Sequence, residues 1–260
     1  MKKFPLLKLL FSLVAFGAAG ARAQNQSAQL IARDPAAAGI DVSADDRPWS
    51  GQAELNFLST VGNTETLSTG AKASGKRNWQ YWALIARGEY LQNRDKGKKT
   101  AESYLFGLRG VRKFPVFDVF SDNEYQRNTF GGFENLYKIA LGLGREFFKG
   151  TPHLLRLEAG PAFVIEERVS GETIRFGSLS VQALHKWKIT DKVELNDRFS
   201  YLTNFEDMAD ARYEFEVGLA APVSTHFSLK AGYLAQYRNR PPVKTDRFDG
   251  KSTFSLLATF

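Results

Sequence analysis

Long stretches of this chain alternate apolar and polar residues with a period of two, and only an extended strand turns that period into two distinct faces. The pattern is clearest in residues 134–148. One face there carries Tyr137, Ile139, Leu141, Leu143 and Phe147, and the other carries Lys138, Ala140, Gly142, Gly144 and Glu146. The segments 192–205, 211–223 and 226–239 alternate in the same way. The sequence therefore predicts an all-β fold.

The chain from Trp49 to its end can be divided into twelve extended segments. We expect strands at 50–60, 65–76, 79–93, 100–113, 116–128, 134–148, 153–168, 173–188, 192–205, 211–223, 226–239 and 247–260. Many of these segments run to about 14 residues, whereas strands of soluble proteins average about 5–6. A strand that crosses a membrane obliquely needs about 9–11 residues in the bilayer. Segment 173–188 changes its apolar face near Gly177, a change that is typical of a β-bulge.

Two architectures compete for such strands. A soluble sandwich would bury the apolar face, whereas a membrane barrel would turn it toward lipid and the polar face toward the lumen. Tight turns that alternate with longer polar loops, such as 93–99, favour the barrel. So do aromatic residues at both ends of the strands, which interfacial belts require. We predict a single antiparallel transmembrane β-barrel of about 12 strands.

The first residues predict export. Lys2 and Lys3 precede a short apolar run, and Ala21-Arg22-Ala23 forms a small-residue cleavage site, as in a secretory signal peptide. We expect a signal peptide at 1–23, a flexible periplasmic leader at 24–48 and the barrel at 49–260. Removing the four basic residues of the signal peptide lowers the net charge from +7 to +3. The predicted location is the outer membrane of a Gram-negative bacterium.

Several short motifs resemble one known family. Trp49-Ser50-Gly51 followed by the turn Gly62, Asn63 and Thr64 is similar to the start of the salt-induced outer membrane proteins, and so is Gly-Leu-Gly-Arg at 142–145. This is a bacterial outer-membrane β-barrel domain family of unknown function. The resemblance implies an outer-membrane location and no agreed catalytic or binding residues.

The predicted lumen carries charges of both signs on many strands. The candidate residues of this lumen charge network are Arg87, Glu89, Arg109, Asp122, Glu124, Arg156, Glu158, Arg198, Glu214 and Glu216. Interleaved charges can pair and close a lumen, or they can line a narrow wet path for small polar solutes. A structural or envelope-stress barrel is therefore the first functional hypothesis, and a narrow channel is the alternative. Eight glycines on these strands are expected either to leave room where long Arg and Glu side chains cross or to mark strand curvature: Gly70, Gly88, Gly107, Gly142, Gly144, Gly160, Gly218 and Gly232.

Other function classes find little support. The chain has no cysteine, so it forms no disulfide and no thiolate metal site. A lipid-modifying enzyme would need an activated histidine, but the three histidines stand in no catalytic motif, so we predict no catalytic residue, metal or cofactor. No basic stripe with a nucleic-acid motif is present. The expected partners are outer-membrane lipid, lipopolysaccharide at the basic loops, and the barrel-assembly machinery, which would read the terminal Phe260.

Overall fold

The computed structural model describes residues 47–60, 66–95, 97–128, 133–148, 151–190, 193–241 and 247–260. These residues form twelve strands and no helix, so none of their segments is a helix that could span a membrane. The strands are β1 (Trp49–Thr60), β2 (Thr66–Asn78), β3 (Trp82–Asp95), β4 (Lys98–Lys113), β5 (Asp118–Asn128), β6 (Phe133–Phe147), β7 (His153–Arg168), β8 (Thr173–Lys188), β9 (Glu194–Asn204), β10 (Ala211–Pro222), β11 (Phe227–Arg238) and β12 (Phe248–Thr259). The all-β prediction is confirmed.

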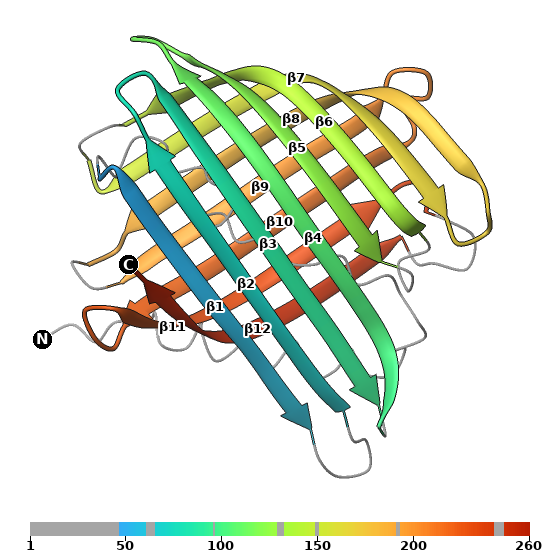
Figure 1. The fold of residues 1–260 in the computed structure, drawn as a ribbon, viewed down its shortest axis with the longest axis horizontal. Coiled ribbons are helices and arrows are strands. Elements are labelled where there is room, and N and C mark those ends of the chain that lie inside the picture. The colour runs from blue at the N-terminus through green and yellow to red at the C-terminus, as the bar shows by residue number, and fades with distance from the viewer. Residues whose placement is uncertain are drawn as a thin grey trace, which may run out of the picture.

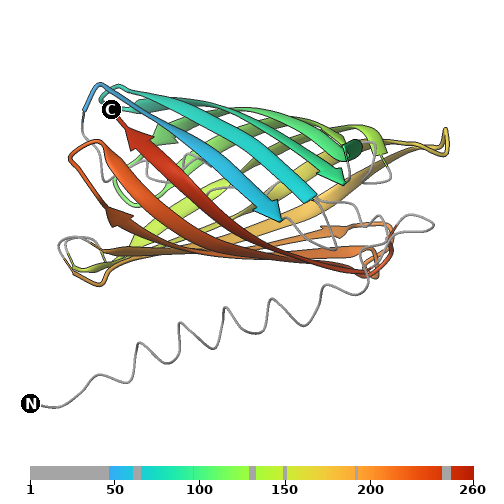
Figure 2. The ribbon, with the colours of Figure 1, turned by 90° about the horizontal axis from the view of Figure 1, so that it is seen from below.

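Each strand pairs antiparallel with its neighbours in the chain, and β1 pairs with β12 to close the barrel (Figure 1). This closing ladder is short: only Gln52–Asn56 of β1 pair with Ser255–Thr259 of β12. In contrast, β1 pairs with β2 along its whole length. Phe260 extends the closure, since its backbone exchanges two hydrogen bonds with Gly51. The C-terminus therefore lies beside the start of β1 (Figure 2). We call this end of the barrel the near rim and the opposite end the far rim.

The barrel has an apolar outer surface and a polar interior. On β6, Leu141 and Leu143 are 55% and 57% exposed, whereas Lys138 and Ala140, which have the opposite parity, are buried. The same alternation of exposed apolar and buried positions recurs on β3, β4 and β7. A soluble sandwich would show the reverse arrangement. An exposed apolar surface of this extent fits acyl chains rather than water, so the barrel interpretation is confirmed over the sandwich.

Aromatic side chains lie at both rims. At the far rim, tyrosines of adjacent strands pack together, with ring centroids 5.1 Å apart in Tyr90–Tyr104 and in Tyr125–Tyr137. At the near rim, Trp79 and Trp82 are exposed. Tyrosine and tryptophan combine an apolar ring with a polar group, which suits the boundary between lipid and water.

Two sequence expectations need correction. The segment 93–99 was expected to be a long loop, but β3 continues to Asp95 and β4 begins at Lys98, so this hairpin is tight. Strand β8 has no bulge near Gly177, because its register with β7 is continuous. The apolar pattern changes there because Phe176 turns into the barrel and joins an interior apolar cluster with Phe133, Leu136 and Val164.

The predictions of a signal peptide, a leader and a family-like turn in the N-terminal part of the chain remain predictions. The expected signal peptide and most of the leader fall within residues 1–46, which lie outside the described residues. The family-like turn Gly62, Asn63 and Thr64 also lies outside them.

Candidate functional site

The barrel interior contains an unusual number of buried charged side chains. They come from strands β1–β7 and β9–β11. They are Glu54, Lys72, Lys76, Arg87, Glu89, Arg109, Asp122, Glu124, Lys138, Arg156, Glu158, Glu166, Arg198, Glu216 and Lys230. Taking a charge out of water costs several kcal/mol unless an opposite charge and hydrogen bonds compensate it, so the partners of these groups decide what the interior can do.

One cluster joins β3, β5 and β6. The Arg87 guanidinium donates hydrogen bonds to Asp122 at 3.1 Å and to Glu124 at 3.0 Å. Lys138 lies 3.6 Å from the same Glu124 carboxylate. Arg87 and Glu124 are on strands that do not pair with each other, so their contact crosses β4.

A second cluster joins β4, β5, β6 and β7. Arg156 donates to Asp118 at 2.7 Å, to Glu146 at 3.1 Å and to Glu158 at 2.6 Å. Glu158 also accepts a hydrogen bond from Arg109. The cluster therefore connects every strand from β4 to β7.

Two glycines make these crossings possible. In the sheet register Gly107 of β4 lies directly between Arg87 and Glu124, and a Cβ there would come within 2.6 Å of the Arg87 guanidinium. Gly144 of β6 lies in the register between Asp118 of β5 and Glu158 of β7, and a Cβ there would come within 2.6 Å of Nη2 of Arg156. Both belong to the eight glycines for which the sequence predicted either such a crossing or strand curvature.

The opposite wall holds further ion pairs. Arg198 of β9 contacts Glu214 and Glu216 of β10, and Gln236 of β11 donates to Glu214 at 2.6 Å. Near the closing seam, Lys230 of β11 donates to Glu54 of β1 at 3.3 Å and thereby spans β12. Glu89 is buried on β3 in register with Lys72 of β2.

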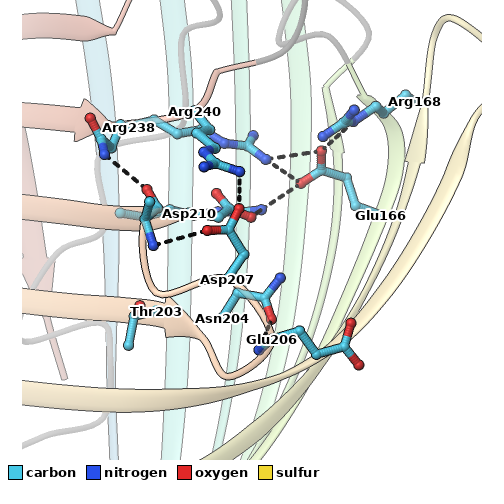
Figure 3. Close-up of polar contacts among 12 residues, drawn as sticks. Glu166, Arg168, Thr203, Asn204, Glu206, Asp207, Asp210, Arg238 and Arg240 are labelled. Atoms are coloured by element: carbon cyan, nitrogen blue, oxygen red, sulfur yellow. Dashed lines mark hydrogen bonds and ion pairs between the residues drawn. The ribbon is translucent and has the colours of Figure 1, made fainter.

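A fourth group, which we call the far-rim cluster, surrounds Glu166 on β7 (Figure 3). Its carboxylate accepts hydrogen bonds from Arg168 at 3.1 Å, from Arg212 at 3.0 Å and from Arg238 at 3.0 Å. Arg212 and Arg238 come from β10 and β11, so they reach Glu166 across β8 and β9. Arg168 also donates to Glu172, at 2.7 Å.

The far-rim cluster rests on apolar side chains inside the barrel. The Arg212 guanidinium lies 5.3 Å from the centre of the Phe176 ring, and Phe176 packs with Phe133, Leu136 and Val164. Leu202 of β9 packs against this group and against a second apolar cluster around Phe120. Apolar side chains therefore contact one another across the interior next to the arginines.

All ten predicted residues of the lumen charge network lie on the inner face of the barrel. Nine of them are buried, and Glu214 is half-buried. Sequence reasoning did not single out Arg212 or the convergence of three arginines on Glu166. Arg212 has the same parity as Glu214 and Glu216, and this signal would have identified it as an inward residue.

No group of three or more histidine, cysteine, aspartate or glutamate side chains able to hold a metal ion occurs among the described residues. Phe260, the predicted assembly signal, is exposed at the near rim.

Comparisons with known proteins agree with this architecture. A family model described as "Protein of unknown function, DUF481" matches residues 53–260. The "Uncharacterized protein YdiY" of Escherichia coli (strain K12) is 24% identical over 242 residues, which cover 90% of this chain and 89% of that protein.

Solved outer-membrane barrels are similar in fold. An outer membrane channel from Pseudomonas putida F1 superposes with a TM-score of 0.55 at 9% identity, covering 85% of this chain and 98% of that chain. The translocator domain of autotransporter NalP from Neisseria meningitidis gives a TM-score of 0.50 at 12% identity, covering 86% and 92%. The NanC porin gives 0.50 at 10% identity, covering 81% and 98%. At these identities the likeness shows the fold alone.

Proposed function

The chain belongs to the family described as "Protein of unknown function, DUF481", and we propose that it is an outer-membrane barrel whose lumen is closed by paired charges. The resemblance of its sequence to the salt-induced outer membrane proteins is confirmed at this level. Its role in this proposal is structural: a stable, non-conducting barrel that supports the envelope under stress. The predicted signal peptide would deliver it, and the near rim would face the periplasm.

The burial of three interior arginines carries the proposal. Arg109, Arg156 and Arg198 are 1%, 0% and 1% exposed, although they point into the lumen. Charged side chains that line an open pore are in contact with the water that fills it. Arginines with almost no surface exposed to water belong instead to a packed interior. Each of the three contacts at least one carboxylate.

A narrow channel is the second candidate, because one wall of the barrel is less filled. Ser180 and Gln182 of β8, Ser200 of β9 and Ala220 of β10 have inward parity, yet they are half-buried rather than buried. Three of these four side chains are small, and none of the four is fully buried, so this wall is less tightly packed than the wall that holds Arg109 and Arg156. The fold of the Pseudomonas putida channel is also similar.

Conductance in planar lipid bilayers tests the proposal. The purified wild-type protein is expected to give no defined single-channel steps. Arg156→Ser is expected to give steps that favour cations, because Asp118, Glu146 and Glu158 lose their shared partner. Arg145→Ser is the matched control, because Arg145 lies on the outer face of β6 beside Phe147.

Defined steps from the wild-type protein, reduced in size by Arg198→Ser, would instead establish the channel. Closed behaviour in the wild-type protein, together with steps in Arg156→Ser and none in Arg145→Ser, would support the packed interior.

An envelope enzyme, the third class considered, gains no positive support. The rings of the histidines that it would use, His153 and His185, contact each other, and His185 also contacts Asp197. The hydroxyl of the nearby Thr151 hydrogen-bonds to backbone atoms of Phe148 and His153. Lipopolysaccharide at the far rim and the assembly machinery at Phe260 remain the proposed partners.

A further inference from the structure

Two arginines near the near rim lie on the outer face of the barrel. Arg77 is close to the end of β2 and Arg112 is close to the end of β4, and both are half-buried. The preceding residues, Lys76 and Val111, are buried in the interior, so Arg77 and Arg112 point outward. A charge on the lipid-facing surface of a barrel is costly at the centre of the membrane but not at its edge. The two arginines therefore mark a part of the outer face that meets charged headgroups.

Tryptophan rings surround the Arg77 guanidinium. Its Cζ atom lies 4.5 Å from the ring centre of Trp49, which is its register partner on β1, and 5.5 Å from that of Trp79. A ring that stacks on a guanidinium covers a face of it and leaves the N–H groups, which lie in the guanidinium plane, able to donate. Arg77 therefore offers donors in a fixed position at a level of the membrane where tryptophan is enriched.

Aromatic rings surround the Arg112 guanidinium in the same way. Its Cζ atom lies 4.8 Å from the ring centre of Trp82, which is its register partner on β3. The ring centres of Tyr81 and Phe114 are 5.3 Å and 5.7 Å away. We call Arg77, Arg112 and the rings around them the near-rim arginine patch.

The two arginines lie close to each other on the outer face. In the register Arg77 is opposite Leu84 of β3, and Leu84 is opposite Gly110 of β4. Arg112 follows two residues after Gly110, so the two Cα atoms are separated by two interstrand spacings, about 10 Å, and by two residues along the strand. An added Cβ at Gly110 would meet nothing within 4 Å, so the surface beside the arginines is open to a lipid molecule.

The positive charge of the patch is not compensated by the strands that carry it. The acidic residues of β1 to β4 are Glu54, Glu89, Asp95 and Glu102. The first two are buried in the interior, and the other two lie toward the far rim. Within the described residues, neither guanidinium of the patch forms an ion pair or a hydrogen bond. Two such charges attract an anion from the surface that they face.

We propose that the near-rim arginine patch binds the phosphate groups of an anionic phospholipid in the periplasmic leaflet of the outer membrane. The N–H groups of arginine match the oxygens of a phosphate in geometry, and the rings of the patch pack against the apolar part of the lipid. A zwitterionic headgroup binds less tightly, because its ammonium group adds a positive charge beside the arginines. The proposal rests on the proposed location and orientation of the barrel, but not on a closed lumen.

Tryptophan fluorescence of the mature protein in vesicles tests the proposal. The parent protein carries Trp187→Phe, so the signal comes from the three remaining tryptophans, which all belong to the patch. The vesicles mix phosphatidylcholine with phosphatidylglycerol, and one of the two lipids carries bromine on its acyl chains to quench the tryptophans that it contacts. The preference for phosphatidylglycerol is expected to be about fivefold for each arginine, as for basic residues at an anionic surface.

Substitutions in the patch should remove this preference. Arg77→Gln and Arg112→Gln are each expected to lower it about fivefold, and the double variant should bind the two lipids equally. Arg127→Gln is the matched control, because Arg127 is exposed on the outer face at the far rim, in register with Tyr104. Equal binding of the two lipids by the parent protein would overturn the proposal. An unchanged preference in the double variant would overturn it as well.

A second measurement needs no variant. Phenylglyoxal modifies arginine side chains, and mass spectrometry gives the rate for each one in the wild-type protein. Arg77 and Arg112 are expected to react more slowly in vesicles that contain phosphatidylglycerol than in phosphatidylcholine alone, whereas the rate for Arg127 should change little. Equal rates for Arg77 and Arg112 in both kinds of vesicle would contradict the site. Conductance of the same preparation reports separately on the lumen, so a failure of the lipid site is distinguishable from a failure of the proposed function.

Discussion

Arg87 on β3 and Glu124 on β5 form an ion pair at 3.0 Å that spans the strand between them. The pair is possible because the position of β4 between them is Gly107. Similar long contacts join β7 to β5 and β11 to β1. Backbone ladders connect only neighbouring strands, whereas these side chains tie together strands that do not pair. The interior network therefore restricts the shape of the barrel in a way that the sheet alone does not.

Gly107→Val is expected to separate Arg87 from Glu124. The added Cβ would lie within 2.6 Å of the guanidinium, and inserting atoms into a packed interior costs about 1–3 kcal/mol. The midpoint of urea-induced unfolding in detergent should fall accordingly. Gly110→Val is the control on the same strand, because a Cβ there meets nothing within 4 Å. Equal midpoints for the two variants would contradict the role of Gly107.

Glu166→Gln is expected to open the far rim to anions. The substitution removes the negative charge shared by Arg168, Arg212 and Arg238, and the three guanidinium groups then repel one another. Reversal potentials in bilayers should show anion-selective conductance, opposite in sign to that expected of Arg156→Ser.

Glu167→Gln provides the comparison for this prediction. Glu167 lies next in the sequence but accepts from Asn135, apart from the arginines. If both variants stay closed, the far-rim cluster does not seal the barrel.

Phe260→Ala is expected to reduce assembly in cells. The Phe260 backbone closes the barrel against Gly51, and its ring is exposed where an assembly factor could read it. The fraction of heat-modifiable, folded protein in membrane extracts should decrease. Phe254→Ala is the control, because Phe254 is exposed on β12, the strand that directly precedes Phe260. A similar decrease in both would indicate a general loss of apolar surface rather than a terminal signal.

The mature protein is expected to begin at Gln24, because the small residues Ala21 and Ala23 flank the predicted cleavage position. Intact mass spectrometry of protein purified from membranes measures this directly. A mass that retains residues 1–23 would show that the N-terminal segment stays attached as an anchor.

The period of two determined the strands and the direction of nearly every side chain. It placed Arg109, Arg156 and Arg198 inside, and the structure has them there. Alternation is a local property of the chain, so a single sequence reveals it. The pattern was misread at Phe176, where an apolar residue that points into the barrel was taken as the sign of a β-bulge. The period of two tells which face a residue occupies, but it does not tell what that face contacts.

The tertiary structure alone decided which groups meet. Glu54 and Lys230 are 176 residues apart, and Glu166 and Arg238 are 72 apart. Such pairs depend on how far each strand slides past the next when the sheet closes, and that offset accumulates around the barrel. The meeting of His153, His185 and Asp197 has the same origin. Residue order fixes each side chain's face, but only the closed register fixes its partner.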